Sequence, residues 1–376
     1  MYRNFRIQHL HFMQVLSTCL LLSGVMVYWD TLNNAVTASY FFFGPSFRND
    51  SFVVSPEEAR KFSDHRYLIN HVDKCLKSED VFLLLFVKSS PKNFQRREGI
   101  RATWGNESYI KRELGVSVKV LFVLGVQDPG HDPKMLVQQQ LKQEDQRHHD
   151  LIQQDFVDSF YNLTVKLLLQ FNWMHDHCSQ ARFVISSDDD MFIHMPNLVR
   201  YLQEAGQQAD GARELWVGRV FRNSGPVRWK TNKYYVSPEM YPWSSYPPYT
   251  GGAAYVLSRD VALRIREATL TLNATLHIDD VFMGICASVI GVTPKAHNFF
   301  SGERKTPYHP CVYKRMITSH GHEGDLRELW ESATSPEVQT VDSGSLGLLY
   351  CSMTRTRLLC NPFNLNTYSC KIANIF

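Results

Sequence analysis

The stretch RFVISSDDDMFI, residues 182–193, joins an apolar, β-branched run to three consecutive aspartates. The run predicts a buried strand, so Asp188, Asp189 and Asp190 would lie at its carboxyl end, where open α/β sheets bind nucleotides. Adjacent carboxylates repel one another, and Mg²⁺ or Mn²⁺ relieves this repulsion by binding one or two of them together with phosphate oxygens. The stretch therefore favours a site for a metal and a nucleotide. The alternative is a solvated acidic turn after a strand.

The segments on either side of this stretch predict further strands and helices. Apolar runs at 81–88 (VFLLLFVK) and 118–124 (VKVLFVL) predict two buried strands, and a helix is expected after Pro133. Spacings of three and four predict one long amphipathic helix, formed by Phe156, Phe160, Leu163, Leu167, Phe171 and Met174. Further strands are expected at 214–219 and 251–257. Strands that alternate with helices predict an α/β fold with a mixed, mostly parallel sheet flanked by helices.

The bulk composition describes a globular protein without affinity for nucleic acid. The chain has 376 residues, and 44% of them are hydrophobic, which is enough for a substantial core. Its net charge of +3 comes from 40 basic and 37 acidic residues spread along the sequence. A nucleic-acid-binding protein needs a concentrated basic surface, so we exclude nucleic acid as a partner.

The N-terminus predicts a membrane anchor. Residues 10–29 are mostly apolar and long enough to span a bilayer, and Arg3 and Arg6 precede them. This arrangement predicts a single-pass type II protein with its N-terminus in the cytoplasm. A cleaved signal peptide is the alternative, but its small-residue site at 36–38 lies far beyond the apolar run. Residues 30–70 show no sustained periodicity and read as a stem.

Cysteines and glycosylation sequons agree with a secretory location. The chain has eight cysteines, and disulfides persist in the secretory pathway. N-glycans are expected at some of the four Asn-X-Ser/Thr sites, at Asn49, Asn106, Asn162 and Asn273. Cys19 lies in the predicted span, where we expect it to be free.

A basic segment, RREGIRATWG at 96–105, follows the first predicted strand. Its arginines could bind a diphosphate through bidentate hydrogen bonds, and Trp104 could stack on a base or a sugar. The candidate donor-binding residues here include Arg97 and Arg101. The alternative is a solvated basic helix face with a tryptophan in the core.

A second acidic pair, Asp279 and Asp280, is bounded by apolar residues on both sides. Such a site can hold one carboxylate as a general base, because burial moves its pKa towards the working pH. The simpler interpretation is a helix N-terminus capped by aspartate, in a helix that runs to Ile290. Both hold if Asp279 caps the helix and Asp280 points into a site.

An aromatic loop and one histidine complete the candidate site. Residues 241–252 (YPWSSYPPYTGG) combine aromatic rings, which stack on sugars, with Gly251 and Gly252, which let a substrate approach the backbone. A packed, proline-rich surface loop is the alternative. His297 follows a predicted helix and short strand, and a lone histidine is more often packed or exposed than bound to a metal. His309, His320 and His322 have no evident ligand partner in the sequence.

With these segments in order, the chain resembles the β1,3-glycosyltransferase family of the Golgi, which contains β1,3-galactosyl- and β1,3-N-acetylglucosaminyltransferases. Five motifs carry the resemblance: RREGIRATWG at 96–105, DFVDSFYNLTVK at 155–166, SDDDMF at 187–192, YPPYTGGAAY at 246–255 and DDVFMG at 279–284. Similarity to members that act on the glycolipid lactosylceramide extends through 152–171, 233–240 and 299–322.

The resemblance implies a nucleotide-sugar-binding fold of the GT-A type and a role for each matched residue. Asp190 would bind Mn²⁺ or Mg²⁺ with His297 as second ligand, and Asp188 and Asp189 would contact ribose and sugar. Asp280 would be the catalytic base. The remaining candidate donor-binding residues are Arg97, Arg101, Trp104, Gly251 and Gly252.

The resemblance also implies a substrate pair, a location and two disulfides. UDP-GlcNAc would be the donor and lactosylceramide the acceptor of an inverting β1,3 transfer, catalysed by an enzyme anchored in the Golgi membrane. Cys75 would pair with Cys178 and Cys286 with Cys311, whereas Cys351, Cys360 and Cys370 stay unassigned. The predicted divisions are a cytoplasmic tail (1–9), an anchor (10–29), a stem (30–70), a catalytic domain (71–328) and a cysteine-containing extension (329–376).

Three alternative functions remain open at this stage. One is transfer of N-acetylglucosamine or galactose to glycoprotein or poly-N-acetyllactosamine acceptors. Another is a non-catalytic glycan-binding module that uses the acids for Ca²⁺ and binds no UDP. The last is a metal-dependent phosphohydrolase, which would need more histidine and aspartate ligands at separate strand ends than the sequence provides.

Overall fold

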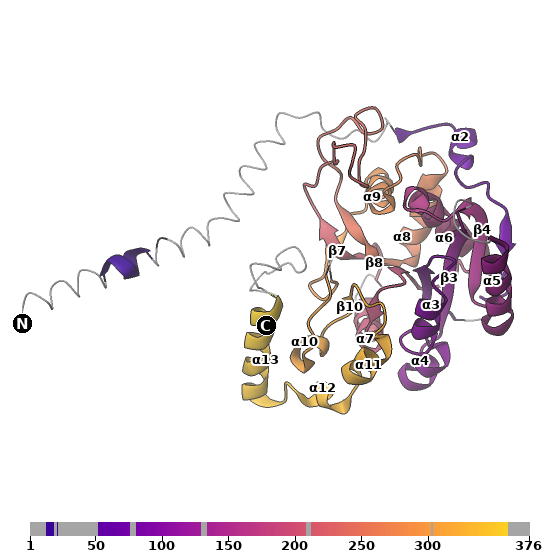
Figure 1. Cartoon of the computed structure of the whole chain (residues 1–376). Helices are drawn as coiled ribbons and strands as arrows, with labels where there is room; N and C mark the ends of the chain where they lie inside the picture. Colours follow the sequence, from indigo (N-terminus) through magenta and orange to yellow (C-terminus); the bar gives the residue numbers. More distant parts are fainter. Residues whose placement is uncertain are drawn as a thin grey trace, which may run out of the picture.

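The computed structural model describes residues 13–18, 21, 52–75, 80–128, 134–207, 212–301 and 304–359. At its centre is an eight-stranded sheet with the order β1-β4-β3-β2-β5-β8-β7-β9 (Figure 1). The strands are β1 (Tyr67–Ile69), β2 (Leu83–Lys88), β3 (Val118–Val126), β4 (Leu151–Val157), β5 (Phe183–Asp188), β7 (Trp216–Phe221), β8 (Tyr249–Ser258) and β9 (Lys295–Ala296).

The sheet is mixed, as the sequence predicted. β2 runs parallel to β3 and to β5, and β3 runs parallel to β4. β8 is antiparallel to both β5 and β7. The register of β2 and β5 pairs Lys88 with Asp188, at the carboxyl ends of both strands. The predicted strands at 81–88 and 118–124 and the strand before the three aspartates are confirmed.

Helices cover both faces of the sheet because the central strands are apolar on both sides. On one face, Leu84 and Phe86 of β2 share a core with α6 (Leu163–His177), α8 (Arg259–Thr269) and α9 (Asp279–Val289). On the other, Leu83, Leu85 and Val87 share a core with helices α3 (Phe94–Arg101), α4 (Glu107–Leu114), α7 (Met195–Gly206) and α11 (Leu326–Ala333). Successive side chains of a strand point to opposite faces of the sheet, so the apolar residues of β2 contribute to both cores.

The region before α6 contains a strand where the sequence predicted one long helix. The helix expected after Pro133 is confirmed as α5 (Lys134–His148), but β4 follows it directly, and Phe156 is buried within that strand. A single 3₁₀ turn, Phe160–Asn162, then leads into α6. Phe156 and Phe160 have helical spacing by coincidence, because the hydrogen bonds that stabilise β4 come from the distant strand β3.

One predicted disulfide is confirmed and the other is wrong. Cys75 is bonded to Cys178. Cys311 is bonded to Cys351 instead of Cys286, which is a free, buried cysteine. The cause is that Cys286 lies on the face of α9 that packs into the core, whereas α13 (Gly344–Leu359) brings Cys351 next to α10 (Pro310–Tyr313). Cys19, Cys360 and Cys370 lie outside the described residues.

Two predicted domain boundaries fall within or beside ordered elements. α11 crosses the boundary expected after residue 328. α2 (Pro56–Arg60) and β1 lie in the stretch 30–70 that was expected to be a stem, and β1 pairs with β4 at the sheet edge. Most of the predicted anchor lies outside the described residues. Among the residues that are described, no helix is long and apolar enough to cross a membrane.

Three of the four sequons lie in the described part of the chain, and Asn49 lies outside it. Asn106 caps α4, and its side chain accepts a hydrogen bond from the Tyr109 amide. The Asn162 side-chain amide donates to the Val157 carbonyl oxygen at 2.8 Å, and Thr164 of that sequon is buried. The Asn273 side-chain oxygen accepts from the Thr275 amide. Attachment of N-glycans stays a prediction.

Candidate active site

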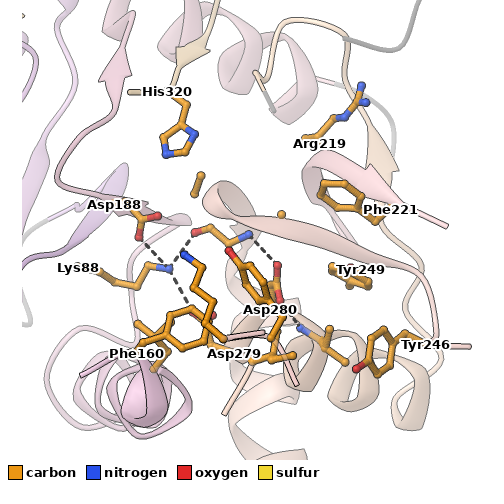
Figure 2. A pocket seen from close by; sticks show the side chains of 18 of the residues that line it. Lys88, Phe160, Asp188, Arg219, Phe221, Tyr246, Tyr249, Asp279, Asp280 and His320 are labelled. Atoms are coloured by element: carbon orange, nitrogen blue, oxygen red, sulfur yellow. Dashed lines mark hydrogen bonds and ion pairs between the residues drawn. The ribbon is translucent and has the colours of Figure 1, made fainter. Parts of the chain in front are cut away.

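A cavity of about 640 Å³ opens where β2 and β5 end, beside β8 and the start of α9. This volume lies in the range of about 300–1,000 Å³ typical of small-ligand sites. The stretch with three aspartates, the second acidic pair and the glycine pair all contribute to its wall. Figure 2 shows Asp188 and His320 on one side of the cavity and Asp280, Tyr246 and Tyr249 on the other.

One wall of the cavity carries a set of possible metal ligands, Asp188, Asp190 and His320. Each offers a ligand atom, and these atoms all lie within 4.8 Å of one another. Asp188 ends β5, whereas His320 follows the short strand β10 (Thr318–Ser319), which pairs with β6 (Phe192–Ile193). Because β6 begins two residues after Asp190, this pairing brings His320 Nε2 to 3.4 Å from Asp190 Oδ2.

The donor set suits a divalent cation. Carboxylate oxygens are the ligands that Mg²⁺ and Mn²⁺ prefer, and an imidazole nitrogen is a common additional ligand of transition metals. Asp190 Oδ1 is buried and has no hydrogen-bond partner among the described residues, so it is available for coordination. Although burial opposes ionisation, the hydrogen bond and charge of His320 hold the pKa of Asp190 below its usual value.

His297 does not belong to this group of ligands, which corrects the expectation from sequence. Its ring lies 4.7 Å from the ring of Tyr201 and 5.6 Å from that of Phe300, measured between centroids. Burial lowers the pKa of His297 to about 4, so the ring is neutral. The sequence contained His320 but gave no reason to choose it, because its approach to Asp190 depends on the pairing of β10 with β6.

Asp280 lies on the opposite side of the cavity, in the first turn of α9. Its carboxylate accepts hydrogen bonds from the backbone amides of Val281, at 2.8 Å, and Gly252, at 3.3 Å. Burial and the charge of Asp279 raise the pKa of Asp280 to about 7, against the effect of Lys88. A carboxyl group with this pKa can accept a proton near neutral pH.

Asp279 faces Lys88, which the sequence analysis did not single out. The Lys88 ammonium group lies 3.1 Å from Asp279 Oδ2 and 3.1 Å from Asp188 Oδ1, and it donates to the Gly252 carbonyl oxygen at 2.9 Å. Its side chain is 5% exposed. Burial disfavours the charge, but Asp188 and Asp279 raise the pKa of Lys88 above its ordinary value. The sequence did contain a sign of this role, because Lys88 is the one charged residue of a strand that is otherwise apolar.

The glycine pair lies in β8 beside both acids. A Cβ atom on Gly252 would point into the cavity, about equally far, at 3.5 Å, from Asp279 Oδ1, Asp280 Cβ and Lys88 Nζ. At Gly251, a Cβ atom would come within 3.0 Å of the Phe221 ring, which is closer than ordinary packing allows. These glycines keep the floor of the cavity free of side chains.

Asp189 turns away from the cavity, which corrects its predicted contact with the substrate. Its carboxylate accepts hydrogen bonds from Ser89 Oγ at 2.6 Å, Asn93 Nδ2 at 2.8 Å and Arg96 Nη1 at 2.9 Å. Only 5% of the residue is exposed. Asp189 therefore holds the end of β5 against the start of α3, while its two neighbours face the cavity.

Arg97 and Trp104 of the basic segment are buried and the Arg101 side chain is mostly buried, which corrects the predicted donor contacts of these three residues. Arg97 is fully buried, and its guanidinium group lies 2.7 Å from Glu144. Arg101 binds Glu144 at 2.7 Å and Asp150 at 2.8 Å. Trp104 is fully buried in the core beneath α3 and α7. Acidic partners from α5 and the loop after it neutralise both arginines. The alternative interpretation was right about a tryptophan in the core but wrong about a solvated basic helix face.

The aromatic loop divides between the core and the cavity. Tyr241 and Trp243 are buried and pack against Phe52, with ring centroids 5.8 and 5.5 Å from it. Tyr246 and Tyr249 line the cavity, and Tyr249 stacks on Phe221 at 5.4 Å. Aromatic surface next to a proton acceptor suits a polar ligand with apolar faces, such as a sugar.

Known proteins with similar sequences act on sugars. The family model described as Galactosyltransferase matches residues 95–298. The lactosylceramide 1,3-N-acetyl-beta-D-glucosaminyltransferase A of Danio rerio is 55% identical over 98% of each chain. The Homo sapiens lactosylceramide 1,3-N-acetyl-beta-D-glucosaminyltransferase is 49% identical over 96% of each chain. Such identity over nearly the whole length, together with the family match across the cavity, shows that this chain is a glycosyltransferase belonging to the galactosyltransferase family.

Proposed function

We propose that the chain transfers N-acetylglucosamine from UDP-GlcNAc to the terminal galactose of lactosylceramide, forming a β1,3 linkage with inversion at the anomeric carbon. The activity of the relatives that are 55% and 49% identical supports the choice of substrates. One observation carries the proposal. The same cavity has a group of possible metal ligands on one wall and, on the other, an aspartate whose pKa is raised to about 7.

Asp188, Asp190 and His320 would hold a divalent cation, Mn²⁺ or Mg²⁺, in a site of the GT-A type. When bound, the metal supplies positive charge that offsets the negative charge developing on the UDP leaving group. The chain adds its own cation at this wall, since Lys88 contacts Asp188 and keeps that carboxylate oriented. Asp189 supports the ligands from behind through its hydrogen bonds to α3.

Asp280 would accept the proton of the acceptor 3-hydroxyl group. As that oxygen forms its bond to the anomeric carbon, the bond from this carbon to the UDP oxygen breaks, and the proton ends on the Asp280 carboxylate. The backbone amides of Gly252 and Val281 hold the carboxylate in position. Attack from the face opposite UDP inverts the anomeric centre, so the chain needs no covalent nucleophile.

A Golgi location with a luminal catalytic domain completes the proposal. The apolar stretch at 10–29 and its flanking arginines support a type II membrane protein. The disulfides Cys75–Cys178 and Cys311–Cys351 support an oxidising compartment.

The test is incubation of the full chain with Mn²⁺ and pairs of donor and acceptor. We expect product from UDP-GlcNAc with lactosylceramide, identified as a β1,3-linked trisaccharide lipid by mass spectrometry and glycosidase digestion. UDP-galactose should give little product. Preferred use of a poly-N-acetyllactosamine or glycoprotein acceptor would contradict the acceptor assignment, and absence of transfer from any nucleotide sugar would contradict the donor assignment.

A further inference from the structure

A loop with exposed aromatic side chains, residues 227–236, borders the cavity between β7 and β8. We call it the Trp229 loop. The Trp229 side chain is 67% exposed, and Tyr234 is 42% exposed. Lys230 and Lys233 are exposed as well. This loop therefore exposes two aromatic rings and two ammonium groups to solvent. Exposed aromatic surface of this kind often marks a binding site.

The base of the Trp229 loop is fixed, so its exposed side chains are displayed by an ordered backbone. The Val236 amide donates to the Val227 carbonyl oxygen at 3.0 Å. The Arg228 guanidinium group donates to the carbonyl oxygens of Val236, Tyr241 and Trp243 at 2.8, 2.6 and 3.1 Å. These hydrogen bonds hold the half-buried Arg228 in place, while its neighbour Trp229 is exposed.

The exposed surface continues into the cavity. Val227, Lys233 and Tyr234 of the loop line the cavity. The Lys233 ammonium group lies 4.9 Å from the centre of the Tyr234 ring and 5.1 Å from that of Phe160, which is another lining residue. Tyr161 follows Phe160 and is 65% exposed. Whatever the Trp229 loop contacts therefore lies at the mouth of the catalytic cavity.

The start of the described domain lies at the same place. Phe52 packs on Tyr241 and Trp243, which are two of the three residues whose carbonyl oxygens accept hydrogen bonds from Arg228. Figure 1 shows the loops between β7 and β8 and the indigo segment that leads to α2 at the same end of the molecule. Residues 30–51 alone separate Phe52 from the predicted anchor at 10–29. Phe52, the first described residue after the predicted anchor, therefore packs beside the base of the Trp229 loop.

We propose that the Trp229 loop and Tyr161 contact the head-group layer of the bilayer that carries the glycolipid acceptor. Tryptophan and tyrosine side chains prefer the interface between water and lipid, and lysine extends its ammonium group to phosphate there. The inference rests on the proposed function. In lactosylceramide, two sugar rings alone separate the reacting hydroxyl from the ceramide, so the cavity mouth must approach the bilayer for Asp280 to reach that hydroxyl. A glycoprotein acceptor imposes no such demand.

The test compares a lipid acceptor with a soluble one. The full chain is reconstituted into phosphatidylcholine vesicles and given UDP-GlcNAc, Mn²⁺ and either lactosylceramide in the vesicles or methyl β-lactoside in solution. Neither Trp229 nor Lys230 lines the cavity. The double variant Trp229→Ser/Lys230→Ser should therefore use lactosylceramide about tenfold more slowly and change by less than about twofold with the lactoside.

A matched control removes an apolar and a basic side chain from another exposed surface. Leu346, which is 83% exposed, and Arg357 lie on α13. The variant Leu346→Ser/Arg357→Ser should use both acceptors at the wild-type rate. The ratio of the lipid rate to the lactoside rate is the quantity compared, so a general loss of folded protein does not imitate the effect.

Three results would overturn the inference. An unchanged lipid rate in the Trp229→Ser/Lys230→Ser variant shows that the loop does not meet the bilayer. An equal loss with both acceptors assigns the loop to the cavity itself. A loss confined to the soluble lactoside assigns the loop to recognition of the sugar instead of the lipid. If the wild-type chain uses another acceptor but not lactosylceramide, the proposed function is wrong. That result comes from the wild-type chain alone, so it is distinguished from a failure of the inference about the Trp229 loop, which only the variant reveals.

Discussion

Two clusters of charged side chains lie beside the central sheet, and they differ in charge balance. The arginine cluster contains two cations and two anions, Arg97, Arg101, Glu144 and Asp150. The cavity cluster contains Lys88 among four aspartates, Asp188, Asp190, Asp279 and Asp280, and two further cations, Arg219 and Lys233, line the same cavity. The first neutralises itself, whereas the second keeps an excess of negative charge that a bound cation would offset.

The carboxyl groups of the two clusters respond accordingly. In the arginine cluster, burial opposes ionisation, but Arg97 and Arg101 lower the pKa of Glu144 below its usual value. In the cavity cluster, burial and neighbouring acids raise the pKa of Asp188 to about 6 and that of Asp280 to about 7. The comparison teaches that charge content does not mark a functional site. A functional site is indicated by charged side chains that the folded chain does not neutralise with partners of opposite charge.

The largest expected effect comes from the unbalanced cluster. Asp280→Asn should lower the rate of transfer about 10³-fold, because the variant keeps the shape of the side chain but cannot accept the proton. Binding of UDP, measured by calorimetry, should stay nearly intact. The control Asp64→Asn changes an exposed acid between α2 and β1 and should leave the rate unchanged. Transfer at the wild-type rate by Asp280→Asn would exclude this residue as the base.

Substitutions in the arginine cluster should lower the stability of the folded protein. Arg97→Met leaves the Glu144 carboxylate buried without its main partner and should lower the free energy of unfolding by about 3–5 kcal/mol. Chemical denaturation measures this change. Folded protein should still bind UDP normally, and the double variant Arg97→Met/Glu144→Leu should recover most of the loss. Unchanged stability with weakened UDP binding would restore the original prediction of a donor contact.

Substitution of two histidines tests the proposed metal ligand, His320, against a packed ring, His297. His320→Ala should weaken the Mn²⁺-dependent binding of UDP by about 100-fold, because it removes one of three ligands. His297→Gln should leave the dependence on Mn²⁺ unchanged, since that ring contacts Tyr201 and Phe300. Titration of UDP binding at several Mn²⁺ concentrations gives both values. The reverse result would exchange the roles of the two histidines.

The smallest effect concerns pH. With a pKa of about 7, Asp280 is mostly ionised above pH 7 and mostly protonated below it. Because the ionised form accepts the proton, kcat/KM should fall about tenfold for each pH unit below about 7. The residual rate of Asp280→Asn should lack this dependence. The groups that set the pKa are Asp279, which raises it, and Lys88, which lowers it, so Asp279→Asn should move the profile to lower pH. A constant rate down to pH 5 would show that the base has an ordinary carboxylic pKa.

Much of the fold followed from local pattern. The apolar runs of β2, β3 and β5 are long enough to indicate strands by themselves. β4 was missed because a glutamine pair and an aspartate interrupt its apolar pattern, and because pairing with β3 stabilises it. Cys311 was assigned to the wrong partner for a related reason, since its approach to Cys351 depends on how α13 packs against α10.

The sequence by itself determined that acidic residues end a buried strand and that a second acidic pair starts a helix, because both features join residues adjacent in the chain. Only the tertiary structure decided which of those acids share a cavity. Successive side chains after a strand point in different directions, so Asp188 and Asp190 face the cavity while Asp189 binds α3. Their partners Lys88 and His320 arrive through strand register, β2 beside β5 and β10 beside β6. Register is set by hydrogen bonds between distant segments, which no local pattern of residues records.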